Sequence, residues 1–404
     1  MKVTKKLIGL LLVLALALSA LTGCAQTSAP VAADTSSDSA ASDTAAAEPT
    51  EAAEAAEATE ATEAAGIPLS EIKVGVVLNT MKEDGGWSQS HNASFLAAKE
   101  QLGLTDDQMI IIDNVPDTGN DCANTIEMLI GEGCNMIFGT SSGLTDAIHA
   151  EAKLHPDVYF HQFEGVPGDN CASYSVRDWE TMFLLGYAGA KLSNGDKLGF
   201  MAAQPQASVV RAVNAYALGA KYANPNATVQ VVWANSWYDP AKEKEGATSM
   251  LASGINVLGY HGSTTAVAEA CTDAGAFMSG FHIDMHDYAP TAVYSSHMWN
   301  WTPLYVEFIN RAVAGTWTGE MLYMGIDSGC AQLAPWNTDI VSADLIAELN
   351  GVQAKLESGE IQVFGGPLSD NTGKEVLAAG AEFTNDQLIG MMFLVDNVIG
   401  QLPS

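Results

Sequence analysis

The chain has 404 residues, of which 48% are hydrophobic, and its formal net charge is −31. The hydrophobic share is that of an ordinary globular protein, so most of the chain can form folded domains. A surface this acidic repels nucleic acid and anionic lipid, and it offers few cations that could hold a phosphate group. The composition therefore argues against nucleic-acid binding, nucleotide binding and a polybasic membrane patch.

Residues 1–24 have the pattern of a secretory signal peptide. Lysines precede an apolar run over residues 7–20, which is too short to span a bilayer. The segment ends in Leu21-Thr-Gly-Cys24, which is similar to a bacterial lipobox, a motif whose cysteine is lipidated and becomes the mature N-terminus. Two acyl chains would anchor the protein stably. We therefore predict that Cys24 anchors the chain at the extracytoplasmic face of the cell membrane; a plain secreted protein is the alternative.

Residues 25–66 are predicted to form a disordered acidic tether. The segment is rich in Ala, Thr, Ser and Glu, contains no aromatic residue, Lys or Arg, and carries a charge of −9. It cannot bury enough apolar surface to offset the entropy of ordering it, and as a flexible coil it would span roughly 35 Å. The remaining residues, 67–404, carry 14 basic and 39 acidic side chains and are enough for about two domains.

Five cysteines follow the tether, at positions 122, 134, 171, 271 and 330. No two of them have the CxxC spacing of a metal or redox motif, and an odd number cannot all pair within one chain. Buried thiols are therefore expected rather than a metal cluster or a disulfide framework.

Strands and helices are predicted to alternate along residues 67–404. In the first half, strands are expected at 73–78, 109–113, 136–139 and 158–163, with helices near 90–102 and 125–130. In the second half, strands are expected at 197–201, 229–233, 257–260, 276–281 and 291–295, with helical segments near 212–223 and 248–252. This alternation with short connections predicts right-handed βαβ units and parallel sheets.

The two halves follow the same plan. Lys73 matches Lys197 at an offset of 124, and three further pairs match at an offset of 121: Asn114 with Asn235, Gly133 with Gly254, and Asn135 with Asn256. A repeated unit predicts two similar α/β lobes rather than one large sheet. Ligands of open parallel sheets bind beyond the carboxyl ends of the strands, so a ligand cleft is expected between the lobes. We expect one lobe at about 67–178 plus 297–325, and the other at about 179–296 plus 326–404.

Five motifs together resemble one family. They are Asp84-Gly-Gly-Trp87, Phe138-Gly-Thr-Ser-Ser-Gly143, Asn235-Ser-Trp-Tyr-Asp-Pro-Ala-Lys-Glu243, Gly280-Phe-His-Ile-Asp284 and Ser295-Ser-His-Met-Trp-Asn-Trp301. The chain is thereby identified as similar to the basic membrane protein lipoproteins, purine-nucleoside-binding components of ABC transporters. The resemblance implies a type I periplasmic-binding-protein fold with two Rossmann-like lobes. It also implies a monomer without a cofactor or enzymatic activity, which passes its ligand to an ABC transporter permease; a sensor ectodomain remains an alternative.

The resemblance also implies how the ligand is held. Family members place the flat base between two aromatic rings, and the matching positions here hold Trp87 and Trp237. A purine has two π faces, and stacking on an aromatic ring contributes roughly 1–3 kcal/mol per base. Core packing is the alternative for each ring.

Polar contacts to the ligand are expected from Ser88, Thr140, Ser141 and Asp284, and Trp299 is also expected at the ligand site. The family commonly has a Lys where this chain has Trp299, and the first of its paired carboxylates reads here as His282. Both departures remove groups that would serve sugar hydroxyls. A free base is therefore favoured over a nucleoside. The purine is expected to be neutral, because residues 67–404 are strongly acidic and the motifs carry no cluster of Lys or Arg.

Two other classes of site fit parts of the sequence. Gly139-Thr-Ser141-Ser-Gly143 matches the nucleophile elbow of serine hydrolases, with Asp and His residues downstream in the right order. The sequence His282-Ile-Asp284-Met-His286 could contribute to a zinc site, because residues two apart on an extended segment point to one side. The duplicated lobes conflict with a single hydrolase sheet, and a fourth strong zinc ligand is not evident. Both remain alternatives to solute binding.

Overall fold

The computed structural model describes residues 66–84 and 86–403. The predicted signal peptide with Cys24 lies outside the described residues, and so does the predicted tether except for Gly66. Within the described part, no helix combines the length and apolar character needed to cross a membrane.

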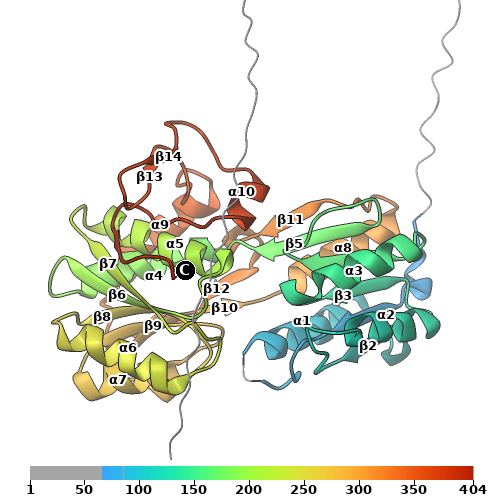
Figure 1. Ribbon diagram of the computed structural model, residues 1–404, viewed down its shortest axis with the longest axis horizontal. Coiled ribbons are helices and arrows are strands. Elements are labelled where there is room, and N and C mark those ends of the chain that lie inside the picture. Colours follow the sequence, from blue (N-terminus) through green and yellow to red (C-terminus); the bar gives the residue numbers. More distant parts are fainter. Residues whose placement is uncertain (1–65, 85, 404) are drawn as a thin grey trace, which may run out of the picture. The chain divides into compact units, whose positions relative to one another are not determined.

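The first lobe is built on a sheet in the order β11-β5-β4-β3-β1-β2, and all its pairings are parallel (Figure 1). The strands are β1 (Val74–Val77), β2 (Met109–Ile112), β3 (Met136–Gly139), β4 (Tyr159–Phe163), β5 (Cys171–Val176) and β11 (Met321–Met324). Its helices are α1 (Trp87–Leu102), α2 (Asp121–Gly131), α3 (Thr145–Leu154) and α8 (Thr302–Ala314), with short 3-10 turns η1 (Leu69–Glu71), η2 (Asp106–Gln108) and η3 (Ser142–Leu144).

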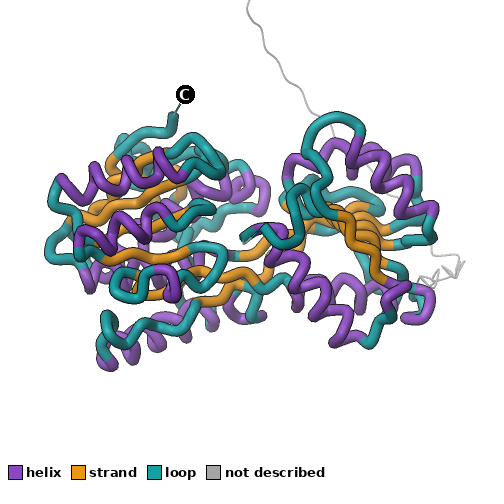
Figure 2. Tube along the Cα trace, turned by 90° about the horizontal axis from the view of Figure 1, so that it is seen from below, coloured by secondary structure: helices purple, strands orange, loops and turns teal. Residues whose placement is uncertain are grey.

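Both faces of this sheet are buried, as Figure 2 shows by the helices on either side of the strands. Successive side chains of a strand point to opposite faces, so a strand covered on both faces reads as a continuous apolar run. In β1, Val74 and Val76 enter one core, which also contains Phe138, while Val77 enters the core on the other face. The run of buried valines is therefore the reason that residues 74–77 form a central strand.

The second lobe repeats this arrangement with a sheet in the order β12-β10-β9-β8-β6-β7-β15. Its strands are β6 (Lys197–Ala202), β7 (Thr228–Trp233), β8 (Val257–His261), β9 (Phe277–Gly280), β10 (Val293–Trp299), β12 (Ala331–Leu333) and β15 (Val398–Ile399). Among the described strands of this sheet, β12 alone pairs antiparallel. Its helices are α4 (Asp178–Leu192), α5 (Ala207–Ala223), α6 (Pro240–Ala252), α7 (Ala266–Ala274), α9 (Ala343–Glu357) and α10 (Asn385–Ile389), with η4 (His286–Tyr288), η5 (Ile326–Ser328) and a hairpin of β13 (Leu368–Ser369) and β14 (Glu375–Leu377).

The internal repeat predicted from the sequence is present in the backbone. The order β2-β1-β3-β4-β5 of one sheet corresponds to β7-β6-β8-β9-β10 of the other. Asn114 and Asn235, matched at an offset of 121, both have positive φ, at 57° and 51°. Gly133 and Gly254 also match, with φ of 92° and 95°. Positive φ is uncommon outside glycine, so the paired values show that the two halves repeat the same turns and confirm the α/β prediction.

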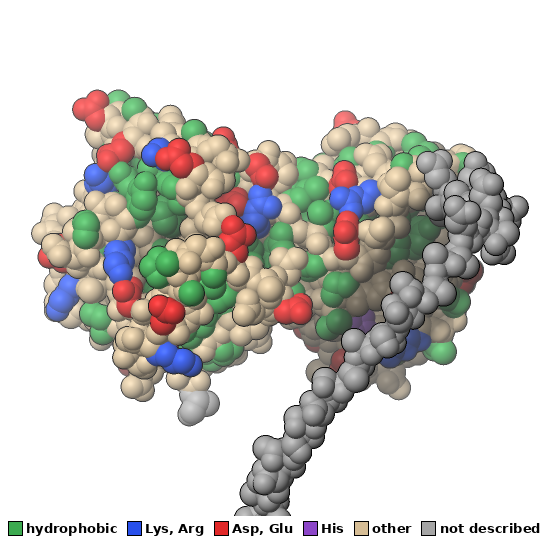
Figure 3. Space-filling view, turned by 90° about the horizontal axis from the view of Figure 1, so that it is seen from above, with side chains coloured by type: hydrophobic (Ala, Val, Ile, Leu, Met, Phe, Trp, Pro, Cys, Tyr) green, Lys and Arg blue, Asp and Glu red, His purple; other side chains and the backbone are tan. Residues whose placement is uncertain are grey.

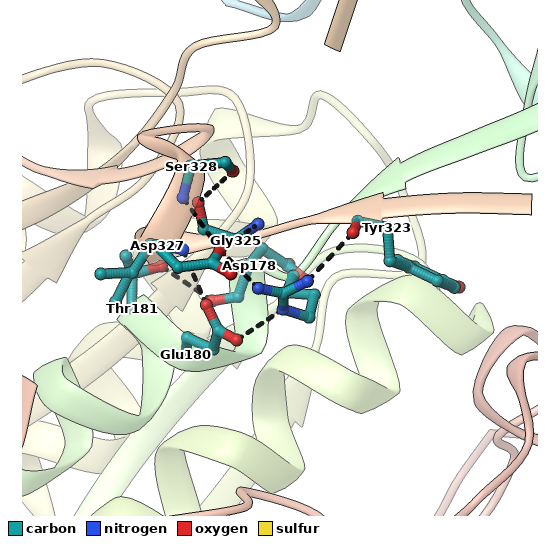
Figure 4. A network of polar contacts seen from close by, with 9 residues as sticks. Asp178, Glu180, Thr181, Tyr323, Gly325, Asp327 and Ser328 are labelled. Carbon is teal, nitrogen blue, oxygen red and sulfur yellow. Dashed lines mark hydrogen bonds and ion pairs between the residues drawn. The ribbon is translucent and has the colours of Figure 1, made fainter. Parts of the chain in front are cut away.

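Within the described residues, the chain passes between the two sheets three times, and a polar network ties two of these crossings together (Figure 4). Arg177 lies in the crossing between β5 and α4. Its guanidinium donates to Glu180 (2.6 Å), to the Tyr323 carbonyl (3.0 Å) and to Asp327 (2.5 Å). Glu180 in turn accepts from the Ile326 N–H at 2.7 Å, in the crossing between β11 and β12. The two crossing segments are thereby held together.

Candidate functional site

A cavity of about 1010 Å³ lies where the carboxyl ends of the strands of both sheets meet. Asn79 follows β1 and Ser141 follows β3 in the first lobe, while His261 ends β8 and His282 follows β9 in the second. Carboxyl ends of parallel strands are the usual place for ligands in such sheets. The volume is at the upper end of the range for small-molecule sites, so the cavity can admit a ligand of a few rings.

The Asp84 carboxylate organises the turn that starts α1. It accepts hydrogen bonds from the backbone N–H groups of Gly86 (2.9 Å) and Ser88 (3.0 Å) and from the Thr80 hydroxyl (2.7 Å). Burial alone would raise the pKa of Asp84, but these hydrogen bonds outweigh it and lower the pKa below its ordinary value. The first N–H groups of a helix have no partner within the helix, and this carboxylate satisfies them. The helix therefore begins at Trp87, whereas the sequence predicted a start near Ser90. Ser88 is buried and is not among the residues that line the cavity.

Trp87 lines the cavity and its ring is held from several sides. Its indole N–H donates to the Thr140 carbonyl at 2.9 Å. The rings of Phe163, Trp301 and Trp299 meet it at steep angles, with centroids 4.9, 5.3 and 5.5 Å away. The Thr140 hydroxyl donates to the Val77 carbonyl and is buried, so this residue fixes Trp87 through its backbone instead of facing the cavity.

Trp237 lines the same cavity from the second lobe. The residue is 44% exposed, and the centroid of its ring lies 6.4 Å from that of His261. The loop that carries it is held on both sides, by the Asn235 N–H, which donates to the Ala203 carbonyl at 3.0 Å, and by Asp239, whose side chain accepts the Lys242 N–H and caps α6. An exposed indole on an anchored loop is available to a ligand.

Trp299 and His282 form a hydrogen-bonded pair on the cavity wall. The indole N–H of Trp299 donates to His282 Nδ1 at 2.8 Å, and both residues line the cavity. His282 has a φ of 71°, a conformation that costs energy in a non-glycine residue and is often found at functional sites. Burial lowers the pKa of His282 to about 4, with Asp84 opposing the shift, so the ring is neutral at pH 7.

Cations that line the cavity are paired with carboxylates. Arg211 pairs with Glu164, and Lys244 pairs with Glu269 at 3.1 Å. Three further carboxylates, those of Asp84, Asp117 and Asp178, also line the cavity. On the face drawn in Figure 3, Lys and Arg side chains lie beside Asp and Glu instead of gathering into a basic patch. The cavity is therefore suited to a neutral ligand and disfavours an anion.

The family is shown by a match between residues 71–365, more than half of the chain, and the model of the ABC transporter substrate-binding protein family called PnrA-like. This protein belongs to that family. It is a substrate-binding protein of an ABC transporter, and family members are solute-binding proteins rather than enzymes.

Curated relatives agree with this membership, and a solved structure agrees with the fold. A purine-binding protein of Brucella abortus is 30% identical over 334 residues, which cover 82% of this chain and 94% of the relative. A Haloferax volcanii protein named as the glucose-binding protein of an ABC transporter is 27% identical, over 80% of this chain and 78% of that protein. A solute-binding protein of Conexibacter woesei has a TM-score of 0.58 at 20% identity, covering 72% of this chain and 98% of that structure. The predicted type I periplasmic-binding-protein fold is confirmed.

The hydrolase alternative based on Ser141 is wrong for this substrate-binding protein. Ser141 has an extended backbone, with φ −133° and ψ 140°, and not the strained turn of a nucleophile elbow. Its hydroxyl donates to Asp117 at 3.3 Å and accepts the Gly143 N–H at 3.2 Å, so it caps η3 at the cavity wall. Among the described residues, no histidine is hydrogen-bonded to it.

Asp284 lies apart from the other predicted ligand residues. It is exposed, its carboxylate accepts the His286 N–H at 2.9 Å, and it is not among the cavity-lining residues. His282 Nδ1 is occupied by Trp299, so the described geometry brings His282, Asp284 and His286 into no common metal site. Of the predicted ligand residues, the structure brings four to the cavity: Trp87, Ser141, Trp237 and Trp299. Sequence reasoning missed Arg211 and Glu164, which lie in segments that carry no motif.

The five predicted buried thiols are confirmed: Cys122, Cys134, Cys171, Cys271 and Cys330 are all buried and free. Burial raises the pKa of each thiol, to about 11 for Cys134 and Cys330. They therefore stay protonated and act as small apolar side chains.

Proposed function

We propose that this substrate-binding protein takes up a neutral purine, as a free base or a nucleoside, and that Trp87 and Trp237 stack on its two faces. The observation that carries this proposal is that Trp87 of the first lobe and Trp237 of the second lobe line the same cavity. Stacking on each ring contributes roughly 1–3 kcal/mol and needs no charge on the ligand. The charge balance of the cavity supports the same choice, because Arg211 and Lys244 are already paired.

The free base is favoured over the nucleoside. In the position where the family commonly has a Lys, this chain has Trp299, whose indole N–H is engaged by His282. The pair supplies no cation and no carboxylate to a ribose. We therefore expect adenine or another purine base to bind at least as tightly as its nucleoside.

The bound purine would be delivered to the permease of an ABC importer at the cell surface. We propose that lipidation of Cys24 holds the protein there as a monomer, with residues 25–66 as the spacer. The sequence motif Leu21-Thr-Gly-Cys24 supports the anchor.

A sugar is the second candidate ligand, because the relative from Haloferax volcanii is named for glucose binding. An indole also packs on the apolar face of a pyranose, so the two tryptophans alone do not decide between the ligands. Asn79 and Asp117 on the cavity wall could serve hydroxyl groups.

A thermal-shift screen separates the candidates. A ligand that binds only the folded state raises the apparent melting temperature by mass action. We expect purine bases to raise it, and nucleosides to do so to the same or a smaller extent, while glucose and other sugars leave it unchanged. A rise with sugars and none with purines would establish the sugar as the ligand.

A further inference from the structure

The hydrogen bond between Trp299 and His282 fixes the tautomer of the histidine. An indole N–H can only donate, so His282 Nδ1, 2.8 Å away, must accept and carries no proton. A neutral imidazole has one proton, which therefore resides on Nε2. His282 is thus a hydrogen-bond donor at Nε2.

This donor belongs to the part of the cavity that carries Trp87. The ring atom Cδ2, which is bonded to Nε2, is the atom nearest to the turn at Gly86, where an added Cβ would lie 3.9 Å from it. The centroids of the His282 and Trp87 rings are 6.3 Å apart. Within the described residues, no hydrogen bond engages His282 Nε2, whereas its Nδ1 is occupied. The positive φ of 71° sets this orientation at an energetic cost, which is expected where a side chain is aimed at a ligand.

We propose that Trp299 is a positioning residue that holds His282 as an Nε2–H donor, and that this donor binds an acceptor nitrogen or oxygen on the edge of the ligand stacked on Trp87. The proposal rests on the purine function proposed above. It adds that the ligand presents an acceptor at this point, such as a ring nitrogen or a carbonyl oxygen of a neutral base. A carboxylate in the place of His282 would instead select a donor.

The chain contains a matched pair of the opposite kind. Trp317 also donates its indole N–H to a histidine, to His161 Nε2 at 2.9 Å. The Nδ1 of His161 lies 3.2 Å from the Ile137 carbonyl, so it carries the proton. His161 is buried and is not among the cavity-lining residues. Trp317→Phe therefore removes the same kind of hydrogen bond as Trp299→Phe, but it leaves the proposed ligand contact unchanged.

Nitrogen NMR of the imidazole rings tests the positioning half. We expect His282 to be the neutral Nε2–H tautomer and His161 the neutral Nδ1–H tautomer in the parent protein. Trp299→Phe should convert His282 alone into a mixture, and Trp317→Phe should affect His161 alone. A parent His282 with its proton on Nδ1, or one unchanged by Trp299→Phe, overturns this half. Melting temperatures of both variants verify that they are folded.

Calorimetry with adenine and its 1-, 3- and 7-deaza analogues tests the ligand half, since each analogue lacks one acceptor nitrogen but keeps both π faces. In the parent, we expect one analogue to bind about tenfold more weakly than adenine, because it leaves a desolvated donor unpaired. That difference should vanish in His282→Ala, shrink in Trp299→Phe and persist in Trp317→Phe.

Equal binding of adenine and all three analogues, or a loss that persists in His282→Ala, overturns the ligand half. If no purine binds to the parent protein, the proposed function itself is overturned, and the ligand half with it. The NMR measurement needs no ligand, so failure of the positioning half is distinguishable from failure of the function.

Discussion

Arg211 on α5 and Glu164 at the end of β4 form an ion pair that joins the two lobes at the cavity wall. The pair is buried, with 1% of the Arg211 side chain and 9% of the Glu164 side chain exposed. Arg211 also donates to the Leu388 carbonyl at 2.8 Å, and Glu164 accepts from the Ser175 hydroxyl at 3.0 Å. Removal of one partner would leave the other charge buried and unpaired, which is far more costly than the absence of both.

We therefore predict that Arg211→Met lowers the free energy of unfolding by about 3–5 kcal/mol. Adding Glu164→Gln to that variant should recover part of the loss, because the stranded carboxylate is gone. Urea unfolding of the two single variants and the double variant measures the coupling. Arg311→Met is the control: its partners Glu307 and Glu320 are partly exposed, so the expected loss is under about 1 kcal/mol. Strictly additive losses at Arg211 and Glu164 would contradict this account.

Stability should fall as the pH is lowered from 7.5 to 5.5. Burial lowers the pKa of His161 to about 3 and that of His282 to about 4, and it lowers the pKa values of His91, His261 and His297 well below 6.5. Below pH 6.5 the unfolded chain binds protons that the folded chain does not, so unfolding is favoured, by roughly 1 kcal/mol per histidine over this range. The stabilisation is present above pH 6.5 and is lost as the pH falls toward 4 and 3.

His161→Gln tests this linkage because glutamine is polar and of similar length but does not titrate. We expect its urea midpoint to depend less on pH than that of the parent; an unchanged dependence would argue against the assignment.

Asp178 acts in the opposite direction. Burial raises the pKa of Asp178 to about 7, with Arg211 opposing the shift. The stabilisation linked to its protonation is therefore complete below pH 3.8 and is lost as the pH rises through 7.

The sequence predicted the elements whose signal is local. The apolar run of β1 and the matched positions Asn114 and Asn235 could be read from spacing and residue type, whereas Trp87 and Trp237 were expected at the ligand site from the family resemblance. Thr140 and Ser88 lie beside that cavity, but their hydroxyls bond to other protein groups. The partnerships of Arg211 with Glu164 and of Trp299 with His282 could not be predicted. They join residues 47 and 17 positions apart: the first depends on the crossing between β5 and α4, and the second on the pairing of β9 with β10.

Gly325 in the crossing between β11 and β12 should not tolerate a side chain. An added Cβ would lie 2.1 Å from Glu180 Oε2 and 2.7 Å from the Arg177 guanidinium, within the network of Figure 4. We predict that Gly325→Ala displaces this network, weakens ligand binding and lowers the melting temperature. Gly351→Ala is the matched control: it lies within α9 with open space around it, so alanine should raise stability by about 1 kcal/mol. A Gly325→Ala protein with parental affinity and melting temperature would show that the crossing is not constrained.

Membrane anchoring is tested at Cys24. With Cys24→Ala we expect the protein to move from the membrane fraction to the soluble fraction, because no lipid can be attached. Fractionation of cells and detection with an antibody against residues 67–404 provides the measurement. Unchanged partitioning of the variant would remove the lipoprotein hypothesis without affecting the ligand proposal.

The most direct test of the central claim is calorimetric titration of adenine into the parent protein, Trp87→Ala and Trp237→Ala. Each substitution removes one of the two stacking faces, so we predict a loss of about 1–3 kcal/mol, or roughly ten- to a hundred-fold in dissociation constant. Trp317→Ala, which removes an indole away from the cavity, should bind adenine like the parent. Parental affinity in both Trp87→Ala and Trp237→Ala would contradict the purine sandwich.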